Sequence, residues 1–322
     1  MESFEKYLSL MRDAYKKQGY HFVGVQAVVK PCHWMKRSLL TRGEKFCYKQ
    51  KFYGIPSHRC LQLSPIIQCS QRCLYCWRAQ PQDLGIDYNE LDVKVYDDPY
   101  TIVENSVKEW QKILSGYLGN PKVDPVMLQE AMRPTHAAIS LVGEPTMYPK
   151  IGELVEAFFE YGFKTTFIVT NGNFPEVISN LEKEPSQLYV SLSAPDEETF
   201  RKVCRPMLKD AWKRVLKTLE LLKSLSCPSV VRITLVRGLN MKGIDKYAKI
   251  LSRAEPTYIE PKAAMSLGYF RYRLGVEPMP RHEEIRAFAE KLAEYTGYNI
   301  IDEAMDSRIV LLSRLNKPLK LM

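Results

Sequence analysis

Three cysteines lie within eight residues, in the sequence CSQRCLYC that runs from Cys69 through Cys73 to Cys76. Thiols at this density are typical of a metal centre, and a cubane [4Fe–4S] cluster takes four thiolates. The spacing is C-x3-C-x2-C without a paired partner motif, so a cluster bound here would keep one iron open for an exogenous ligand. Zinc and a disulfide are the alternatives. Zinc sites usually complete four ligands from paired motifs, which favours the cluster.

An aromatic residue, Tyr75, directly precedes the last of these cysteines. With it, the triad resembles the radical S-adenosylmethionine (SAM) superfamily. There the open iron chelates the methionine end of SAM, and an electron from the cluster releases a 5′-deoxyadenosyl radical. The resemblance implies a [4Fe–4S] cluster on Cys69, Cys73 and Cys76, with SAM as its ligand.

Three further cysteines, Cys32, Cys47 and Cys60, precede the triad with 14 and 12 residues between them. They would supply a second cluster with its own open iron, whereas scattered structural thiols are the alternative. The surrounding segment 30–60 carries eight Lys and Arg and a single acid. Aromatic residues alternate with these cations, as on a surface that stacks bases and neutralises phosphate, although a solvated loop would also explain the charge. These aromatics are Trp34, Phe46, Tyr48, Phe52 and Tyr53.

The composition is that of a globular protein with a basic surface. The chain has 322 residues, 45% of them hydrophobic, and a formal net charge of +9. The charge favours a polyanionic partner such as RNA. No apolar run is long enough to cross a membrane and the N-terminus lacks a leader pattern, so we expect a cytoplasmic protein with no membrane partner. In that reducing compartment, eight cysteines indicate metal ligands or buried thiols.

Apolar runs alternate with amphipathic segments along most of the chain, which predicts a parallel sheet with helical crossovers. The predicted strands are 61–67, 136–142, 165–170, 188–193, 230–236 and 258–263, and the predicted helices between them are 99–118, 151–161, 174–183, 197–203, 211–225 and 244–253. A helix at 3–18 and a strand at 22–30 precede them; a helix at 282–295 and a hairpin-like pair, 298–302 and 309–312, follow.

This pattern predicts an α/β fold, a partial (β/α)6 barrel of the radical SAM type with an N-terminal extension that carries a second Fe–S site. Residues 1–60 would form the extension, and residues 61–322 the barrel with C-terminal tRNA-binding elements. Functional residues are expected at the C-terminal strand ends. Gly143-Glu144-Pro-Thr resembles the superfamily element Gly-Gly-Glu, with Val142 in place of the first glycine. The predicted SAM contacts at these ends are Gly143, Glu144, Thr146, Asn171, Ser191 and Ser193.

A closer resemblance joins the two cysteine groups to three further stretches, Cys47-Tyr-Lys49, Thr170-Asn-Gly-Asn173 and Ile259-Glu-Pro-Lys262. Together they resemble the archaeal tRNA 4-demethylwyosine synthase family over nearly the whole chain. The resemblance implies two [4Fe–4S] clusters, SAM, and pyruvate as co-substrate. The implied reaction converts N1-methylguanosine, next to the anticodon of phenylalanine tRNA, into 4-demethylwyosine. An external flavodoxin- or ferredoxin-like electron donor is implied, because the flavodoxin-like domain of eukaryotic relatives is missing.

The resemblance also implies roles for individual residues. Cys32, Cys47 and Cys60 would hold the auxiliary cluster, and Lys49 would form an imine with pyruvate. Lys262 is the alternative lysine, although an ion pair with Glu260 is its simpler explanation. The predicted tRNA-binding residues are Arg271, Arg273 and Arg281. Two other functions remain open at this point: a radical SAM enzyme that acts on a protein or peptide, and a non-catalytic zinc- or cluster-bearing RNA-binding module.

Overall fold

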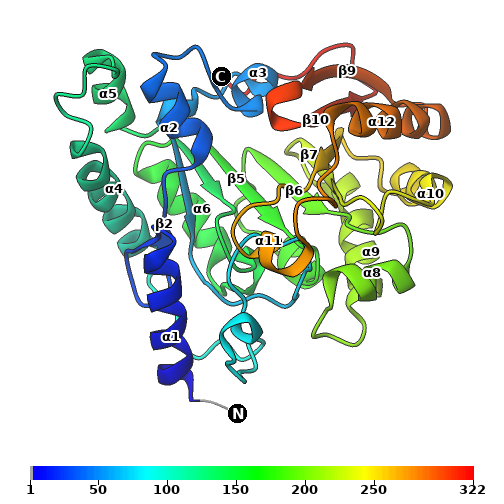
Figure 1. Ribbon diagram of the computed structural model, residues 1–322, viewed down its shortest axis with the longest axis horizontal. Coiled ribbons are helices and arrows are strands. Elements are labelled where there is room, and N and C mark those ends of the chain that lie inside the picture. The colour runs from blue at the N-terminus through cyan, green and yellow to red at the C-terminus, as the bar shows by residue number, and fades with distance from the viewer. Residues whose placement is uncertain (1–2) are drawn as a thin grey trace.

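The strands form a single sheet in a computed structural model that describes residues 3–322. The strand order is β1-β2-β3-β4-β5-β6-β7-β8-β10-β9. β3 to β8 run parallel to one another and are joined by helical crossovers. They are β3 Cys60–Ser64, β4 His136–Ile139, β5 Thr165–Thr170, β6 Gln187–Ser191, β7 Ser229–Leu235 and β8 Tyr258–Ala263. These pairings confirm the six predicted parallel strands, and Figure 1 shows helices flanking the sheet, as expected for the α/β class.

Two of the six strands have the predicted bounds, whereas β3 and β4 end three residues early. The apolar runs continue past these strand ends because the following residues are buried loops. Leu141 N donates to Leu63 O at 3.1 Å, and Val142 N donates to Ser64 Oγ at 2.7 Å. An apolar run in the sequence indicates buried residues, and here the buried residues continue beyond the last strand hydrogen bonds. The predicted strands are therefore too long at this end.

The helices complete the crossovers and cover the sheet. They are α1 Phe4–Lys17, α2 His33–Leu40, α3 Tyr48–Tyr53, α4 Pro99–Ser115, α5 Pro125–Ala131, α6 Ile151–Glu160, α7 Pro175–Ser179, α8 Glu197–Cys204, α9 Ala211–Leu221, α10 Ile244–Ala254, α11 Tyr269–Leu274 and α12 His282–Thr296. Short 3₁₀ turns are η1 Ser57–Arg59, η2 Pro81–Leu84, η3 Pro145–Met147, η4 Leu222–Ser224 and η5 Met305–Ser307. α7 is half the length predicted for it. Within residues 3–322, no helix is long and apolar enough to cross a membrane.

The two ends of the chain add antiparallel strands to the parallel sheet. The predicted strand 22–30 is instead a hairpin of β1 His21–Phe22 and β2 Val28–Val29, and β2 pairs with β3. The chain turns there because the Asp97 carboxylate accepts hydrogen bonds from the N–H groups of Val25, Gln26 and Ala27. At the other end, β9 Asn299–Ala304 and β10 Ile309–Ser313 form the predicted hairpin, and β10 pairs with β8.

The segment 30–60 is not the aromatic surface predicted from its composition. Tyr48, Phe52 and Tyr53 are buried, because α3 packs them against Phe167 and Tyr189 of the sheet. The expectation that these three rings stack bases is therefore wrong. Phe46 alone of the five predicted aromatics is exposed.

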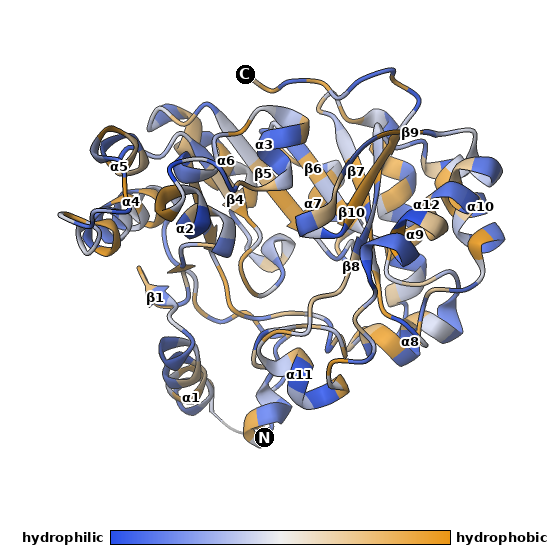
Figure 2. Ribbon diagram, turned by 45° about the horizontal axis from the view of Figure 1, so that its top comes forward, coloured by the Kyte–Doolittle hydropathy of each residue, from blue (hydrophilic) through white to orange (hydrophobic). Residues whose placement is uncertain are grey.

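The sheet has an outer face under the crossover helices and an inner face toward α3. Along β6, Leu188 and Val190 belong to the main core, whereas Tyr189 belongs to the cluster around α3. Figure 2 shows the strongly hydrophobic colours concentrated on the central strands. The same alternation places Cys60, Arg232 and Glu260 on the inner face.

Candidate active site

The Cys69–Cys76 triad lies on one loop between β3 and η2, and all eight cysteines of the chain are free thiols. Backbone hydrogen bonds fix this loop to the C-terminal end of α8. Arg72 N donates to Cys204 O and Leu74 N donates to Val203 O, each at 2.9 Å. The loop directly follows the end of β3 and contacts Asn171 just after β5, so it lies at the C-terminal edge of the parallel strands, as predicted.

The turn after β5 holds the other side of the loop. Asn171 Nδ2 donates to Ser70 Oγ at 3.0 Å and lies 3.8 Å from Cys69 Sγ. Asn173 is fully buried, and its Oδ1 accepts hydrogen bonds from Ser70 Oγ and Gln71 Nε2 at 3.1 and 3.0 Å. Asn173 is not among the predicted site residues, since its sequence context indicates only a polar turn.

A buried ion pair stabilises the loop that carries the three cysteines. Arg72 Nη1 lies 2.5 Å from Glu90 Oε2, and the two side chains are only 12% and 3% exposed. Tyr7 of α1 donates a hydrogen bond to the same carboxylate. Burial raises the pKa of Glu90, and Arg72 opposes that rise. The N-terminal helix is therefore connected to the loop through a charged group that the sequence does not reveal.

Glu144 connects the ends of β4 and β5. Its Oε1 accepts hydrogen bonds from the hydroxyls of Thr146 and Thr170, both at 2.6 Å, and its Oε2 accepts one from Asn171 N at 2.7 Å. Burial raises the pKa of Glu144, and these hydrogen bonds lower it. The carboxylate thus orients the backbone around the loop. On the next strand, Ser191 ends β6, and Ser193 beyond it shares a 2.6 Å hydrogen bond with Tyr75 Oη.

Gly143 has no room for a side chain. Its φ is +67°, and a Cβ atom would lie 2.4 Å from Ile66 O and 2.7 Å from Gln68 O. The glycine therefore permits contact between its own backbone and the segment that leads to Cys69. This close approach alone requires glycine at position 143, whether or not Gly143 also makes the predicted contact with SAM.

We expect Gly143→Ala to destabilise the protein by about 1–3 kcal/mol, because a left-handed non-glycine residue and a displaced backbone both cost free energy. Thermal unfolding of the native and variant proteins measures this loss. Gly162→Ala is the matched control, since Gly162 has a φ of +102° and nothing within 4 Å of an added Cβ. Equal losses in both variants would show that the close approach to Ile66 is unimportant.

The triad has the donor chemistry of an iron–sulfur site. Burial raises the pKa of Cys69, and contact with the Cys204 thiol, followed by burial, raises that of Cys73. A bound iron centre reverses such shifts, because thiolates are its ligands. The residues present fit a cluster because three soft thiol donors lie on one loop. Cys204 is a fourth thiol at this place, although its position in the sequence gives no signal of it.

Cys32, Cys47 and Cys60 come together although they are far apart in the chain. Cys32 is the N-cap of α2, where its Sγ accepts a hydrogen bond from Met35 N at 3.3 Å; Cys47 is the N-cap of α3, and Cys60 begins β3. Burial, followed by Cys32, raises the pKa of Cys47 to about 11. Burial also raises that of Cys60 to about 12, with further contributions from Cys32 and Cys47.

The three thiols are thus close enough to one another to interact electrostatically. In the described part of the chain, no three His, Cys, Asp or Glu side chains are grouped as the ligands of a single metal ion. A cubane cluster instead binds its cysteines at separate iron corners. A soft, three-thiol donor set suits iron–sulfur ligation.

Lys49 is buried beside this second thiol group. Its Nζ lies 3.9 Å from the ring centroid of Phe167 and 4.8 Å from that of Tyr189. Among residues 3–322, no oxygen accepts a hydrogen bond from this amine. Burial lowers the pKa of Lys49, opposed mainly by the Cys60 thiol. The Lys49 side chain is therefore buried beside thiols, and its amine contacts two aromatic rings.

Lys262 differs from Lys49 in being engaged by the backbone. Its Nζ donates to Ser307 O at 2.6 Å, and burial lowers its pKa to about 8. The predicted ion pair between Lys262 and Glu260 is wrong. Glu260 lies opposite Arg232 in the parallel register, and Arg232 Nη2 is 2.6 Å from its carboxylate. Tyr53 Oη donates to Glu260 as well, at 2.8 Å.

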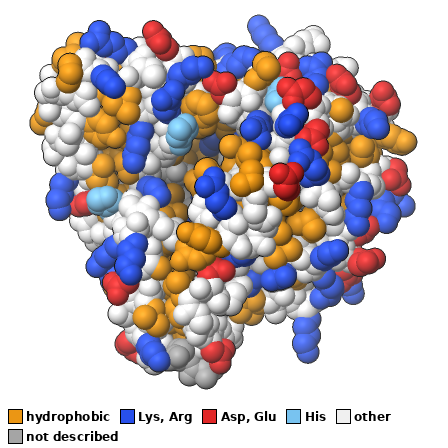
Figure 3. Space-filling view, viewed as in Figure 1, with side chains coloured by type: hydrophobic (Ala, Val, Ile, Leu, Met, Phe, Trp, Pro, Cys, Tyr) orange, Lys and Arg blue, Asp and Glu red, His pale blue; other side chains and the backbone are white. Residues whose placement is uncertain are grey.

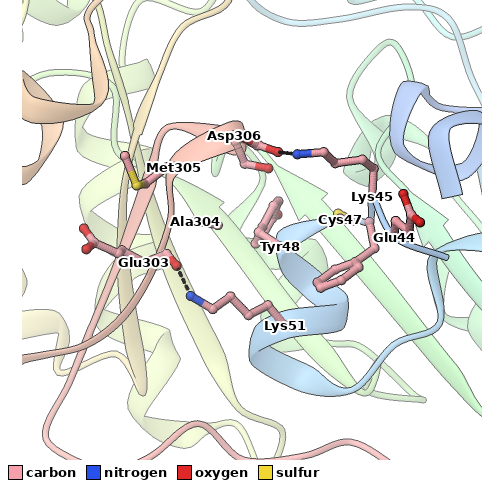
Figure 4. A pocket seen from close by; sticks show the side chains of 11 residues that line it. Glu44, Lys45, Cys47, Tyr48, Lys51, Glu303, Ala304, Met305 and Asp306 are labelled. Carbon is pink, nitrogen blue, oxygen red and sulfur yellow. Dashed lines mark hydrogen bonds and ion pairs between the residues drawn. The ribbon is translucent and has the colours of Figure 1, made fainter. Parts of the chain in front are cut away.

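A pocket of about 350 Å³ opens next to Cys47 (Figure 4). It lies between the residues that lead into α3 and the turn from β9 to β10. Lys45 bridges the two sides by pairing with Asp306 at 3.0 Å, and Lys51 does so by donating to Glu303 O at 2.5 Å. These contacts connect the second thiol group to the C-terminal hairpin.

The three predicted tRNA-binding arginines have different surroundings. Arg271 and Arg281 are exposed. Arg273 is 12% exposed, and its guanidinium pairs with Asp83 and donates to the backbone oxygens of Cys76 and Arg78. Arg273 is thus committed to holding the cysteine loop. Figure 3 shows that other Lys and Arg side chains are distributed widely over the face in view.

Comparison with protein families gives two matches. Residues 63–251 match the radical SAM superfamily, and residues 253–314 match the family described as wyosine base formation. The first covers the end of β3 and the parallel strands β4 to β7, and the second covers β8, α11, α12 and the C-terminal hairpin.

Individual relatives agree with these matches. A SAM-dependent tRNA 4-demethylwyosine synthase from Pyrococcus horikoshii is 51% identical over 94% of this chain and 88% of its own length. The Methanocaldococcus jannaschii protein of the same name is 40% identical over 94% and 95%. A solved structure described as TYW1 with a lysine–pyruvate adduct bound has a TM-score of 0.84, with 36% identity over 100% of this chain and 99% of that one.

Proposed function

Since this chain belongs to the family of SAM-dependent tRNA 4-demethylwyosine synthases, we propose that its active site uses two iron–sulfur clusters and pyruvate. The protein is a radical SAM enzyme that forms the wyosine base on tRNA. The observation that carries the proposal is the buried side chain of Lys49, whose amine lies over two aromatic rings beside a second group of three thiols. Neither a peptide-modifying enzyme nor a non-catalytic RNA-binding module accounts for it.

Cys69, Cys73 and Cys76 would hold the SAM cluster. When bound, that cluster supplies the electron that cleaves SAM to a 5′-deoxyadenosyl radical. The proposed SAM contacts surround the loop from the ends of β4, β5 and β6. Glu144 is the most constrained of them, because its carboxylate fixes the backbone of Asn171 and the hydroxyl of Thr146. The full set is Gly143, Glu144, Thr146, Asn171, Ser191 and Ser193.

Cys32, Cys47 and Cys60 would hold the auxiliary cluster, near Lys49. We assign these thiols to residues 1–60, the proposed extension, and the SAM cluster to the sheet of residues 61–322. Two helix N-caps and the first residue of a central strand supply the thiols, so the site is built from rigid elements. Three cysteines far apart in the chain are thus gathered at one place, where Cys32, in addition to burial, raises the pKa of both Cys47 and Cys60, which supports a shared metal site over scattered structural thiols.

Lys49 would bind pyruvate covalently. Its neutral amine attacks the ketone carbon, water leaves, and an imine remains on Nζ. Burial favours the neutral amine, because it disfavours charge. The lysine–pyruvate adduct described for the similar TYW1 structure supports this assignment. A lysine that binds pyruvate covalently would hold it at one fixed position for the reaction.

Phenylalanine tRNA would be the macromolecular substrate, and a flavodoxin- or ferredoxin-like protein would be the electron donor. The test of this function is a reaction with anaerobically reconstituted protein, SAM, pyruvate, dithionite and a tRNA that carries N1-methylguanosine. We expect nucleoside mass spectrometry to find 4-demethylwyosine only when all components are present. Product formed equally well without pyruvate, or none with the complete mixture, would contradict the proposal.

A further inference from the structure

The short helix α11 is fastened to the loop that carries the SAM-cluster cysteines. Tyr269 N donates to Trp77 O at 2.9 Å, and Gly268 approaches the same oxygen so closely that a Cβ atom would lie 2.3 Å from it. Arg273 adds its contacts to Asp83 and to the backbone of Cys76. Phe270 is fully buried beneath the helix. α11 and the residues after Cys76 therefore form one unit.

Large aromatic side chains remain exposed on this unit. Tyr272 is 83% exposed and Trp77 is 38% exposed. The Tyr269 and Tyr272 rings lie 5.6 Å apart, and the Arg78 guanidinium is 5.1 Å from the centroid of the Trp77 ring. Arg271 is exposed on the same helix. Rings grouped with arginines at an accessible place indicate a binding surface, since a single exposed ring would need no explanation.

We propose that Trp77 and Tyr272 form a stacking platform for unpaired bases of the tRNA anticodon loop, and that Arg271 neutralises a neighbouring phosphate. The inference rests on the proposed function, because tRNA is the partner. Proteins recognise single-stranded RNA by stacking its bases on aromatic rings and arginine planes, beside cations that follow the backbone. The platform offers both kinds of group: Trp77 directly follows Cys76, and Tyr272 and Arg271 lie on α11, which is hydrogen-bonded to Trp77. Stacking neighbours of the target base here would help extract that base toward the cluster.

In this arrangement Arg273 does not have the tRNA-binding role that was predicted for it. Its guanidinium is satisfied by Asp83 and two backbone oxygens, so it has little left for phosphate. It is a positioning residue that sets the platform at a fixed place relative to Cys76. Arg281, which is exposed near the start of α12, stays a candidate for a phosphate contact outside the platform.

The experiment measures binding of N1-methylguanosine-containing phenylalanine tRNA by fluorescence anisotropy at several salt concentrations. We expect Tyr272→Ala and Trp77→Ala each to weaken binding about 5- to 100-fold, the range of a base–aromatic stack. Tyr272→Phe should bind like the native protein because it keeps the ring. The control is Tyr295→Ala, which removes a 62% exposed ring from α12 and should change nothing.

The salt dependence separates stacking from charge. Tyr272→Ala should leave the slope of log affinity against log salt unchanged, whereas Arg271→Gln should reduce its magnitude by about 0.7–0.9. Thermal midpoints show whether each variant is folded, and Tyr272→Ala should match the native protein since the ring is almost fully exposed. Native affinity in folded Tyr272→Ala would overturn the platform.

A protein partner is the competing occupant, and the same variants distinguish it. If the platform instead received the electron donor, Tyr272→Ala would slow SAM cleavage with reduced flavodoxin but not with dithionite, and tRNA binding would be unchanged. That result would overturn the inference. If the native protein binds tRNA but makes no 4-demethylwyosine, the proposed function fails independently of these variants. If it makes the product and the variants bind normally, only the platform fails.

Discussion

Replacing Cys69, Cys73 and Cys76 together by Ala should abolish reductive SAM cleavage and remove about half of the iron, from about eight atoms per chain to about four. The triad would supply all the protein ligands of the cluster that binds SAM, so no residual site can deliver an electron to the sulfonium. The measurement is 5′-deoxyadenosine produced with dithionite, together with the iron content of the anaerobically reconstituted protein. Normal 5′-deoxyadenosine production by this variant would refute the assignment.

The matched control replaces Cys32, Cys47 and Cys60 by Ala. It should lose the same amount of iron but continue to cleave SAM, because the loop after β3 is intact. 4-Demethylwyosine should disappear, since pyruvate would no longer be held near the radical. Unchanged iron content in this variant would show that the three thiols are structural.

Lys49→Ala should lower product formation by more than about 100-fold, the effect expected when a reacting group is no longer held in place. Both clusters and SAM cleavage should remain, because Lys49 would contribute no ligand to either. Borohydride reduction in the presence of pyruvate traps an imine as a stable adduct, and peptide mapping locates it. We expect the adduct on Lys49 in the native protein and none in the variant.

Lys262→Ala is the control for this experiment. Lys262 is also buried with a lowered pKa, but Ser307 O already accepts a hydrogen bond from its amine. Trapping on Lys49 should therefore persist in Lys262→Ala. An adduct that maps to Lys262, or that survives in Lys49→Ala, would reverse the roles of the two lysines.

Much of the fold follows from local patterns in the sequence. The bounds of β5 and β8 match their apolar runs, and α1 begins directly after Ser3, within the predicted helix 3–18, and the Ser3 side chain accepts a hydrogen bond from Lys6 N. The hairpin at the N-terminus could not be predicted in the same way. Its turn depends on Asp97, a residue about 70 positions away in the chain.

The candidate site likewise has some residues that local sequence patterns predict and others that they do not. Cysteine spacing and the polar residues after each strand indicate where SAM chemistry would take place, because parallel strands gather their ends at one edge. The residues that support the site are not predictable from spacing. Asn173, the Arg72–Glu90 pair and Arg273 act through partners that are remote in sequence. Tyr48 shows the converse, since an aromatic residue among cations belongs to the core when a helix packs it there.

The most direct test of the account follows the carbon atoms of pyruvate into the tRNA base. The protein would be incubated with SAM, dithionite, N1-methylguanosine-containing tRNA and pyruvate labelled with ¹³C either at the carboxyl carbon or at the other two carbons. We expect 4-demethylwyosine to carry both carbons from the second pyruvate and none from the first, because the bond between the carboxyl and keto carbons breaks and the carboxyl carbon leaves as a one-carbon species. Product that retains the carboxyl label, or that contains no pyruvate carbon at all, would contradict it.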